Sequence, residues 1–443
     1  MTMDRAAEAA LEEAPEKLPV AVRRRIFLYL GILTVLLAFG GPSGGLIDIP
    51  VSFFLKNRLH LEAQEVAHFR LIASIPLYLS FVFGFARDIW NPLGMRDRGF
   101  LLLFGGLCAL FYLGFALAPL TYPSLLIAII VLTTSFLFVA SAQNGLMSTI
   151  GQQHAMTGQI SALWNVFASI PTVASLLIGG WLSNLLEQQN DASASRILFL
   201  AGAAIMIAVS LFGLLRPRDV FAHVHPERGQ EAHAIEDIKR LLGHWRIYPA
   251  LLIWFLWNFA PGAATPLQYH LQNVLHASDA QWGQWNAIFA ASFIPTFILY
   301  GFLCRRFPLK TLLVWGTVVA VPQNVPLLFT PSVAAALIAA VPMGLMGGVA
   351  TGAYMDLIMR SCPRGLQGTM LMMAGSLFFM VTRFGDILGT FLYDRYGGFS
   401  VCVVAITLVY ALILPSLLLV PKNLIATSDG QRNEDVNEIR YSR

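Results

Sequence analysis

Long apolar blocks separated by short polar stretches dominate the chain, and alternating apolar and polar positions are not the rule. A block of about 20 apolar residues is long enough to cross the hydrocarbon core of a bilayer as a helix. Glycine and proline inside such blocks do not argue against helices, because membrane bundles tolerate both. The pattern predicts twelve spans, at about residues 26–48, 66–86, 100–119, 122–148, 157–186, 195–215, 248–272, 281–303, 310–329, 332–358, 367–392 and 398–420.

Composition supports a membrane protein. Of the 443 residues, 56% are hydrophobic and only 12% are charged, about half the charged fraction of a soluble domain. The first twenty residues are polar and acidic and contain no apolar core of a signal peptide, so we expect a soluble tail there. The cysteines, Cys108, Cys304, Cys362 and Cys402, show neither metal-binding nor disulfide spacing and are expected to be small buried side chains.

Lysine and arginine gather in alternate connections. They precede the first span, follow spans two, eight and ten, and fill the connection after span six, whereas the other connections hold few. Basic residues favour the cytoplasmic side. We therefore expect a multi-pass protein of the inner or plasma membrane with both termini in the cytoplasm.

The longest internal polar segment, residues 216–247, divides the chain into two sets of six spans. It contains AIEDIKRLLGHW, in which Ile235, Ile238, Leu241 and Leu242 share one face of a helix. This amphipathic helix is expected to connect the halves along the cytoplasmic face, with a regulatory role as the alternative. The predicted organisation is a tail (1–25), a six-helix bundle (26–215), the linker (216–247), a second six-helix bundle (248–420) and a second tail (421–443).

The connections after spans two and eight are similar, which suggests an internal duplication. The first begins GFARD and the second GFLCR, and each continues to a proline–leucine turn and a basic residue. The first resembles the loop-two motif of the major facilitator superfamily, and the matching residues are Gly84, Asp88, Gly94, Arg96 and Arg98. The resemblance implies an all-α membrane protein, with twelve transmembrane helices in two pseudo-symmetric six-helix bundles.

The resemblance also implies that Asp88 faces the start of span eleven, GLQGTM from Gly365, and holds the cytoplasmic side closed. Gly84 would let two helices approach closely. The alternative is a loop that only sets topology, with an incidental aspartate. Arg305 stands in the second half where an acid stands in the first, so we expect this contact on one side only. Asp356, with Arg360 at i+4, is assigned to the same gate.

Several stretches are similar to the folate–biopterin transporter family within that superfamily. They are VSFFLKNRL (51–59), SIPLYLSFVFGFARDIWNPLGMRDRG (74–99), GQISALWN (158–165) and RSCPRGLQGTMLMMAGSLFFM (360–380). This narrower resemblance covers parts of both halves and implies a substrate like a pterin or folate.

Charged residues inside the spans are candidate functional groups, since a charge at the bilayer centre costs roughly 2.5–3.5 kcal/mol on insertion scales. Arg383 is expected to bind an anionic group of the substrate, and Asp386, at i+3, to position that group or to carry protons; the alternative is an ion pair between the two. Asp48 follows a glycine-rich run and is a second candidate proton site, or else the outer cap of span one. Arg70 is a candidate substrate ligand, or else an interfacial residue.

Aromatic and amide side chains inside the spans suit a flat, hydrogen-bonding ring system. The alternatives are interface belts for the aromatic residues and bridges between helices for the amides. The candidates are Asn144, Trp164, Asn165, Trp257, Asn258 and Tyr269.

Motifs for other functions are absent. The sequence contains no GxxxxGK[ST] phosphate loop, no HExxH and no GxSxG motif, so we expect neither an ATP-driven pump nor an enzyme, and no metal or cofactor. No basic, aromatic surface suggests nucleic acid. We therefore predict a monomeric secondary active transporter that moves a small organic solute by alternating access, driven by protons or another cation. A drug-type exporter, a muropeptide-permease-like importer and a non-transporting membrane sensor or scaffold are the alternatives.

Overall fold

The computed structural model of the chain is helical throughout the part it describes. That part comprises residues 19–43, 46–47, 51, 54–55, 59, 63–118, 121–188, 193–221, 239, 241–363, 365–396 and 398–431, and it contains no strand. Asp48 and most of the predicted amphipathic helix in the linker lie outside these residues.

Six predicted spans form the first half. The second span is broken at Ser74 and Leu79, on either side of Pro76, because proline cannot donate the hydrogen bond that continues a helix. The helices of this half are α2 (Val20–Gly40), α4 (Ala63–Ala73), α5 (Ile75–Tyr78), α6 (Ser80–Ile89), α7 (Asp97–Leu117), α8 (Tyr122–Gln153), α9 (Thr157–Gln188) and α10 (Ser193–Phe212), with a short 3-10 turn η2 (Pro92–Gly94) before α7 and α11 (Arg218–Phe221) after α10.

The second half repeats this plan. Its first span is interrupted between Asn258 and Thr265 by a segment with Pro261 and Gly262, and Gly262 has a φ of 117°. The elements are α13 (Ile247–Asn258), α14 (Thr265–Tyr269), η3 (His270–Val274), α15 (Asp279–Leu303), α16 (Leu309–Ala320), η4 (Val325–Phe329), α17 (Val333–Ser361), α18 (Gln367–Tyr396), α19 (Phe399–Ala411), α20 (Ile413–Ser416), η5 (Leu417–Leu419) and α21 (Lys422–Ile425).

Each predicted span corresponds to one helix or to a run of consecutive helices. The first is displaced: α2 begins at Val20 and ends at Gly40, where the Gly-Gly-Pro sequence stops it. Among the described residues, seven helices are long and apolar enough to cross a membrane. The predicted all-α architecture is confirmed.

The halves are two bundles that meet along two equivalent pairs of helices. In the first half α2 packs on α9 and α10, and in the second α15 and α16 pack on α17. Between the halves, α6 packs on α18 and α15 packs on α9. These pairs join spans two and eleven and spans eight and five, so a shift of six spans converts one pair into the other.

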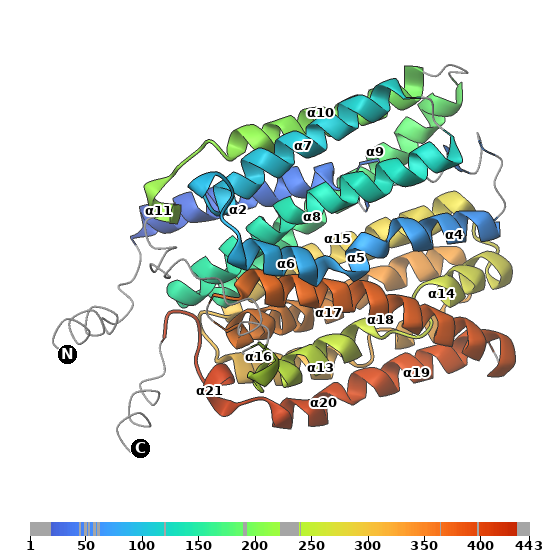
Figure 1. Cartoon of the computed structure of the whole chain (residues 1–443). Helices are drawn as coiled ribbons and strands as arrows, with labels where there is room; N and C mark the ends of the chain where they lie inside the picture. Colours follow the sequence, from blue (N-terminus) through green and yellow to red (C-terminus); the bar gives the residue numbers. More distant parts are fainter. Residues whose placement is uncertain are drawn as a thin grey trace.

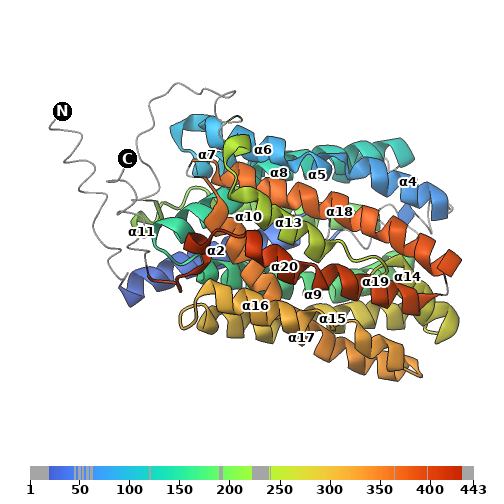
Figure 2. The same ribbon diagram turned by 90° about the horizontal axis from the view of Figure 1, so that it is seen from below.

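One end of the molecule carries the start of α2 together with α11 and α21, and we call it the termini end (Figure 1). Figure 2, seen from below, shows α15, α16 and α17 on one side and α4, α6 and α8 on the other, with α18 between them. A large apolar core includes residues of both halves, whereas a second cluster around Leu267, Ala340 and Cys402 belongs to the second half alone. All four cysteines are buried and unpaired, as predicted.

Candidate functional site

Hydrogen bonds between the two halves gather at the termini end. They join α6, the end of α8 and the start of α9 to the end of α17, the start of α18 and the segment after α21. Two clusters of buried charge, one on each helix pair, organise these contacts. We call the set of contacts the termini-end gate.

In the first cluster, Asp88 caps helix α18 of the opposite half. Its carboxylate accepts hydrogen bonds from the backbone N–H groups of Gly368 at 3.1 Å and Thr369 at 2.6 Å, and from the Thr369 hydroxyl at 2.7 Å. Free N–H groups and the positive end of the helix dipole make a helix N-terminus a favourable place for a carboxylate. The contact expected from the sequence, between Asp88 and the start of span eleven, is present.

Arg87 holds this carboxylate in place. Its Nη1 donates to Asp88 at 2.8 Å, while its Nε and Nη2 donate to Asp97 at 2.6 and 2.8 Å. Such two-pronged pairs fix both partners in one orientation. From the sequence, Arg87 was counted only as a topological charge, and Asp97, although part of the charged loop, was given no role; the adjacency of Arg87 to Asp88 was the available signal.

A glycine makes this approach possible. A Cβ atom on Gly84 would lie 2.5 Å from the carbonyl oxygen of Gly368 and 2.8 Å from Cα of Thr369, so α6 and α18 touch backbone to backbone. One turn away, the hydroxyl groups of Ser80 and Ser376 are 2.8 Å apart. The predicted role of Gly84 in close helix packing is thus consistent with the geometry.

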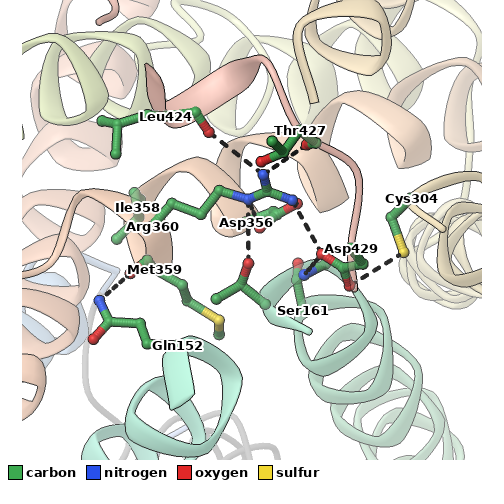
Figure 3. A network of polar contacts seen from close by, with 12 residues as sticks. Gln152, Ser161, Cys304, Asp356, Ile358, Met359, Arg360, Leu424, Thr427 and Asp429 are labelled. Carbon is green, nitrogen blue, oxygen red and sulfur yellow. Dashed lines mark hydrogen bonds and ion pairs between the residues drawn. The ribbon is translucent and has the colours of Figure 1, made fainter. Parts of the chain in front are cut away.

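The second cluster is centred on Arg360 (Figure 3). Its guanidinium contacts Asp356 at 2.9 and 3.2 Å, which is the predicted i, i+4 contact, and Asp429 at 3.0 Å. Asp356 is fully buried and also accepts a hydrogen bond from the hydroxyl of Tyr300 at 2.9 Å. Arg360 also donates to the carbonyl of Thr427 at 2.9 Å, so the segment after α21 is bound to α17.

Asp429 caps helix α9 of the first half. It accepts from the backbone N–H groups of Gly158 at 3.2 Å and Gln159 at 2.9 Å. The expectation that only one half provides such a contact is therefore wrong. The loop after span eight has Arg305 where the first half has an acidic residue, and the segment after the last span supplies the carboxylate instead. Sequence reasoning missed Asp429, because a Ser-Asp-Gly stretch indicates a turn but not its partner.

The environment of Asp429 shifts its titration. Burial raises its pKa to about 6, and the nearby charge of Asp356 adds to the rise, while Arg360 and the N–H groups of Gly158 and Gln159 oppose it. Two carboxylates that share one guanidinium inside the protein explain this direction.

Two other predicted gate residues lie beside these clusters. Arg98 donates to the carbonyl groups of Gly213 at 3.0 Å and Leu214 at 2.9 Å, at the end of α10 in its own half. The backbone N–H of Arg96 donates to the Asn91 side chain at 2.7 Å, in a tight turn where Arg96 has a φ of 50°. Arg98 thus ties the start of α7 to the chain after α10, and the bond between Arg96 and Asn91 closes the turn between α6 and α7.

The charged residues predicted for substrate lie away from the termini end. Asp386 accepts from the backbone N–H of Thr265 at 2.9 Å and from its hydroxyl at 2.8 Å, and so ties α18 to the start of α14. Arg383 is exposed, and it makes no ion pair with the described residues. Arg70, on α4 of the first half, is exposed as well.

Two of the three asparagines predicted to bind substrate form hydrogen bonds to carbonyl groups one turn earlier in their own helices. Asn165 donates to the carbonyl of Ser161 at 2.8 Å and Asn258 to that of Trp254 at 2.8 Å, each within its own helix. Asn144 reaches the opposite half, where its amide lies 3.3 Å from the sulfur of Met372.

The predicted aromatic ligands differ in burial. Trp257 is buried and stacks on Tyr410, with ring centroids 4.7 Å apart, whereas Tyr269 is 51% exposed. Trp164 is partly buried against the apolar core. Within the described residues, no group of three or more metal-ligating side chains is positioned to hold a metal ion.

Comparison with known proteins identifies the family. The model of the Major Facilitator Superfamily matches residues 156–390, more than half of the chain. A folate-biopterin transporter of Synechocystis sp. is 23% identical over 420 residues, which cover 88% of this chain and 81% of that protein.

Solved structures share the fold. The transporter FucP in its outward conformation superposes with a TM-score of 0.66 at 16% identity, over 89% of this chain and 98% of that one. The human organic anion transporter MFSD10 gives 0.62 at 16% identity, over 90% and 100% of the two chains. The proton:xylose symporter XylE gives 0.62 at 12% identity, over 94% and 99%. The chain is a multi-pass membrane protein and belongs to the Major Facilitator Superfamily of transporters.

Proposed function

We propose that this protein is a secondary active transporter that works by alternating access, with the termini-end gate closed in the present structure. The observation that carries the proposal is the pair of carboxylates, Asp88 and Asp429, each of which caps a helix of the other half. Such contacts are directional and few, so a rocking motion of one bundle against the other can break them together.

The position of the basic residues favours a cytoplasmic termini end. On that assignment the gate described above is the inner gate, and the protein is closed toward the cytoplasm. We propose a monomer as the working unit, because each bundle pair is completed within one chain.

The proposed substrate is a small organic anion with a flat ring, such as a pterin or folate. Support comes from the similarity to the folate-biopterin transporter of Synechocystis sp. and from the exposed Arg383 on α18. Gly368, Met372 and Ser376 form one stripe of α18 that contacts the first half at the termini end. Arg383 continues this stripe two turns, or about 10 Å, beyond Ser376. We therefore propose that its side chain faces solute where the halves separate.

Arg383→Ala is expected to reduce transport of an anionic substrate at least tenfold. Arginine binds carboxylate or phosphate through a planar, two-pronged contact, which lysine reproduces only in charge. Arg383→Lys should therefore retain part of the activity. Uptake of labelled folate, pterin and other organic anions into proteoliposomes would measure both variants.

Arg395→Ala is the matched control, because Arg395 is an exposed arginine near the end of the same helix. Unchanged transport of every anion by Arg383→Ala would disprove the anion-binding role. Absence of flux for the unaltered protein with all of them would instead favour a sensor or scaffold, and flux of neutral drugs or muropeptides would favour the alternative transporters.

Protons are the proposed coupling ion, with Asp386 and Asp48 as candidate carriers. Collapse of the proton gradient with a protonophore is expected to abolish accumulation of the substrate against its gradient, while exchange of substrate across the membrane continues. Accumulation that persists without the gradient would exclude proton coupling. Asp386→Asn should uncouple transport in the same way, if Asp386 is the carrier.

A further inference from the structure

The interface between the halves contains two equivalent helix pairs, and each pair has a carboxylate that caps a helix. The two carboxylates come from positions in the chain that the internal repeat does not relate. In the α6–α18 pair, the carboxylate of Asp88 comes from the end of α6 itself. In the equivalent α15–α9 pair, Cys304 and Arg305 directly follow α15, and no acidic residue stands there. Asp429, more than a hundred residues later in the chain, occupies the corresponding position at the N-terminus of α9.

The segment that carries Asp429 is anchored to the second half. The backbone N–H of Asp429 donates to the carbonyl of Cys304 at 2.9 Å, and the N–H of Leu309 donates to the carbonyl of Thr427 at 3.4 Å. Only its tip crosses to the first half, where the N–H of Gly430 donates to the carbonyl of Ala155 at 2.7 Å. The segment thus bridges the halves at the same place as the carboxylate.

We propose that Asp429 is a second gating residue: it caps α9 as Asp88 caps α18, and the segment from Lys422 to Gln431 must leave α9 before the termini end can open. This inference rests on the alternating access proposed above. It adds a positioning residue to the transport cycle and assigns a mechanical role to the part of the chain that follows the last span.

The charges of the cluster make this closure dependent on pH. Asp429 contacts Arg360 of α17 and Cys304, which follows α15, while Asp356 of α17 and Tyr300 of α15 lie on the other side of the Arg360 guanidinium. From α9, the described contacts of the cluster are N–H groups, the amide of Gln159 and the hydroxyl of Thr157. Two carboxylates and one guanidinium leave one negative charge in the Arg360 cluster. Uptake of one proton would cancel it.

The direction follows from the titration of Asp429, whose pKa is about 6 in the closed gate and would return toward the ordinary value of about 4 on exposure to water. Between about pH 4 and pH 6, the closed form then binds more protons than the open form. Closure is therefore stabilised as the pH falls through about 6, and this stabilisation is lost as the pH rises above it.

The experiment measures the distance between the halves directly. Leu93, in the first half, and Phe307, in the second, are 61% and 44% exposed near the termini end. Leu93→Cys and Phe307→Cys would carry spin labels, and the buried native cysteines should react little. Distance distributions of the full-length protein in detergent, by electron–electron double resonance near pH 7.5 and pH 5.5, report open and closed populations without a substrate.

The unaltered protein is expected to become more closed at the lower pH. Asp429→Ala should raise the ratio of open to closed protein about tenfold and remove the pH dependence, because the N–H groups of α9 and one edge of Arg360 lose their acceptor. Asp429→Asn keeps an acceptor oxygen, so it should remain closed and also lose the pH dependence. Asp394→Asn, an exposed acid on α18, is the control and should behave as the unaltered protein.

Either of two results would overturn the inference. One is a distance distribution of Asp429→Ala that matches the unaltered protein at both pH values. The other is a pH dependence that survives in both Asp429 variants, which would leave Asp429 a purely structural role. The readout needs no solute, so failure to detect transport would count against the proposed function and not against this gate.

Discussion

Gly84→Ala is expected to prevent closure of the termini end. The added methyl group would lie 2.5 Å from the carbonyl oxygen of Gly368 and 2.8 Å from Cα of Thr369. Both are backbone atoms, so no side-chain rotation relieves the overlap, and α6 and α18 must separate. The same movement takes Asp88 away from the N-terminus of α18. We expect the spin-labelled pair at positions 93 and 307 to show mainly the longer distance, and transport to fall at least tenfold.

Gly114→Ala is the matched control. Gly114 lies inside α7, and a Cβ atom added there meets nothing within 4 Å. Alanine is favoured over glycine in a helix by roughly 1 kcal/mol, so this change should leave closure and transport intact and, if anything, stabilise the protein. A Gly84→Ala protein that closes and transports like Gly114→Ala would show that the backbone contact between α6 and α18 is not needed for the gate.

Arg360→Ala is expected to produce the largest loss of stability. The side chain is 12% exposed and holds Asp356 and Asp429, which are 0% and 1% exposed. Its removal leaves two buried carboxylates without their cation, and breaking a buried pair in this way costs about 3–5 kcal/mol of the free energy of unfolding. Thermal and denaturant unfolding in detergent would measure this loss of stability. The loss should be smaller near pH 5.5 than near pH 7.5, because a carboxyl that takes up a proton no longer needs the guanidinium.

Arg305→Ala provides the comparison, since Arg305 is an exposed arginine at the same end of the molecule. Its effect should be within a few tenths of a kcal/mol. A triple variant with Arg360→Ala, Asp356→Asn and Asp429→Asn should recover much of the stability, because no uncompensated charge remains buried. If Arg360→Ala alone unfolds like the unaltered protein near pH 7.5, the cluster does not carry the energy assigned to it.

The fold was predictable from sequence because its main determinant is hydrophobic length. Apolar blocks identified all twelve spans, and the displaced end of α2 shows the limit: the apolar pattern continues past Gly40, whereas the Gly-Gly-Pro turn stops the helix. Breaks at Ser74 and at residues 259–264 were likewise not placed, since proline and glycine are common in membrane helices that do not break.

The gate was only half predictable. Asp88 lies in a recognisable motif beside a glycine, and Asp356 and Arg360 lie four residues apart on one helix, so local spacing was informative. Asp429 has no such spacing: its partners are in α9 and α17, and tertiary packing alone brings it to them. Asp386 was expected to position the substrate or to carry protons, and the sequence did not indicate its observed partner: Thr265 follows an irregular segment that the apolar pattern does not place.

The carboxylates of Asp88 and Asp429 both accept hydrogen bonds from backbone N–H groups at the N-terminus of a helix. In each helix, the first of these N–H groups belongs to a glycine, Gly368 in α18 and Gly158 in α9. A Cβ atom on Gly158 would lie 2.7 Å from Cβ of Cys304, and one on Gly368 would lie 2.8 Å from an Asp88 carboxylate oxygen, so both positions are restricted in size. They are not restricted in chemistry, because any residue except proline has an N–H group. Among relatives of this protein, statistical covariation should therefore show little pairing between Asp88 and position 368 or between Asp429 and position 158. A comparison of sequences that searches for complementary side chains would overlook these backbone contacts between the halves.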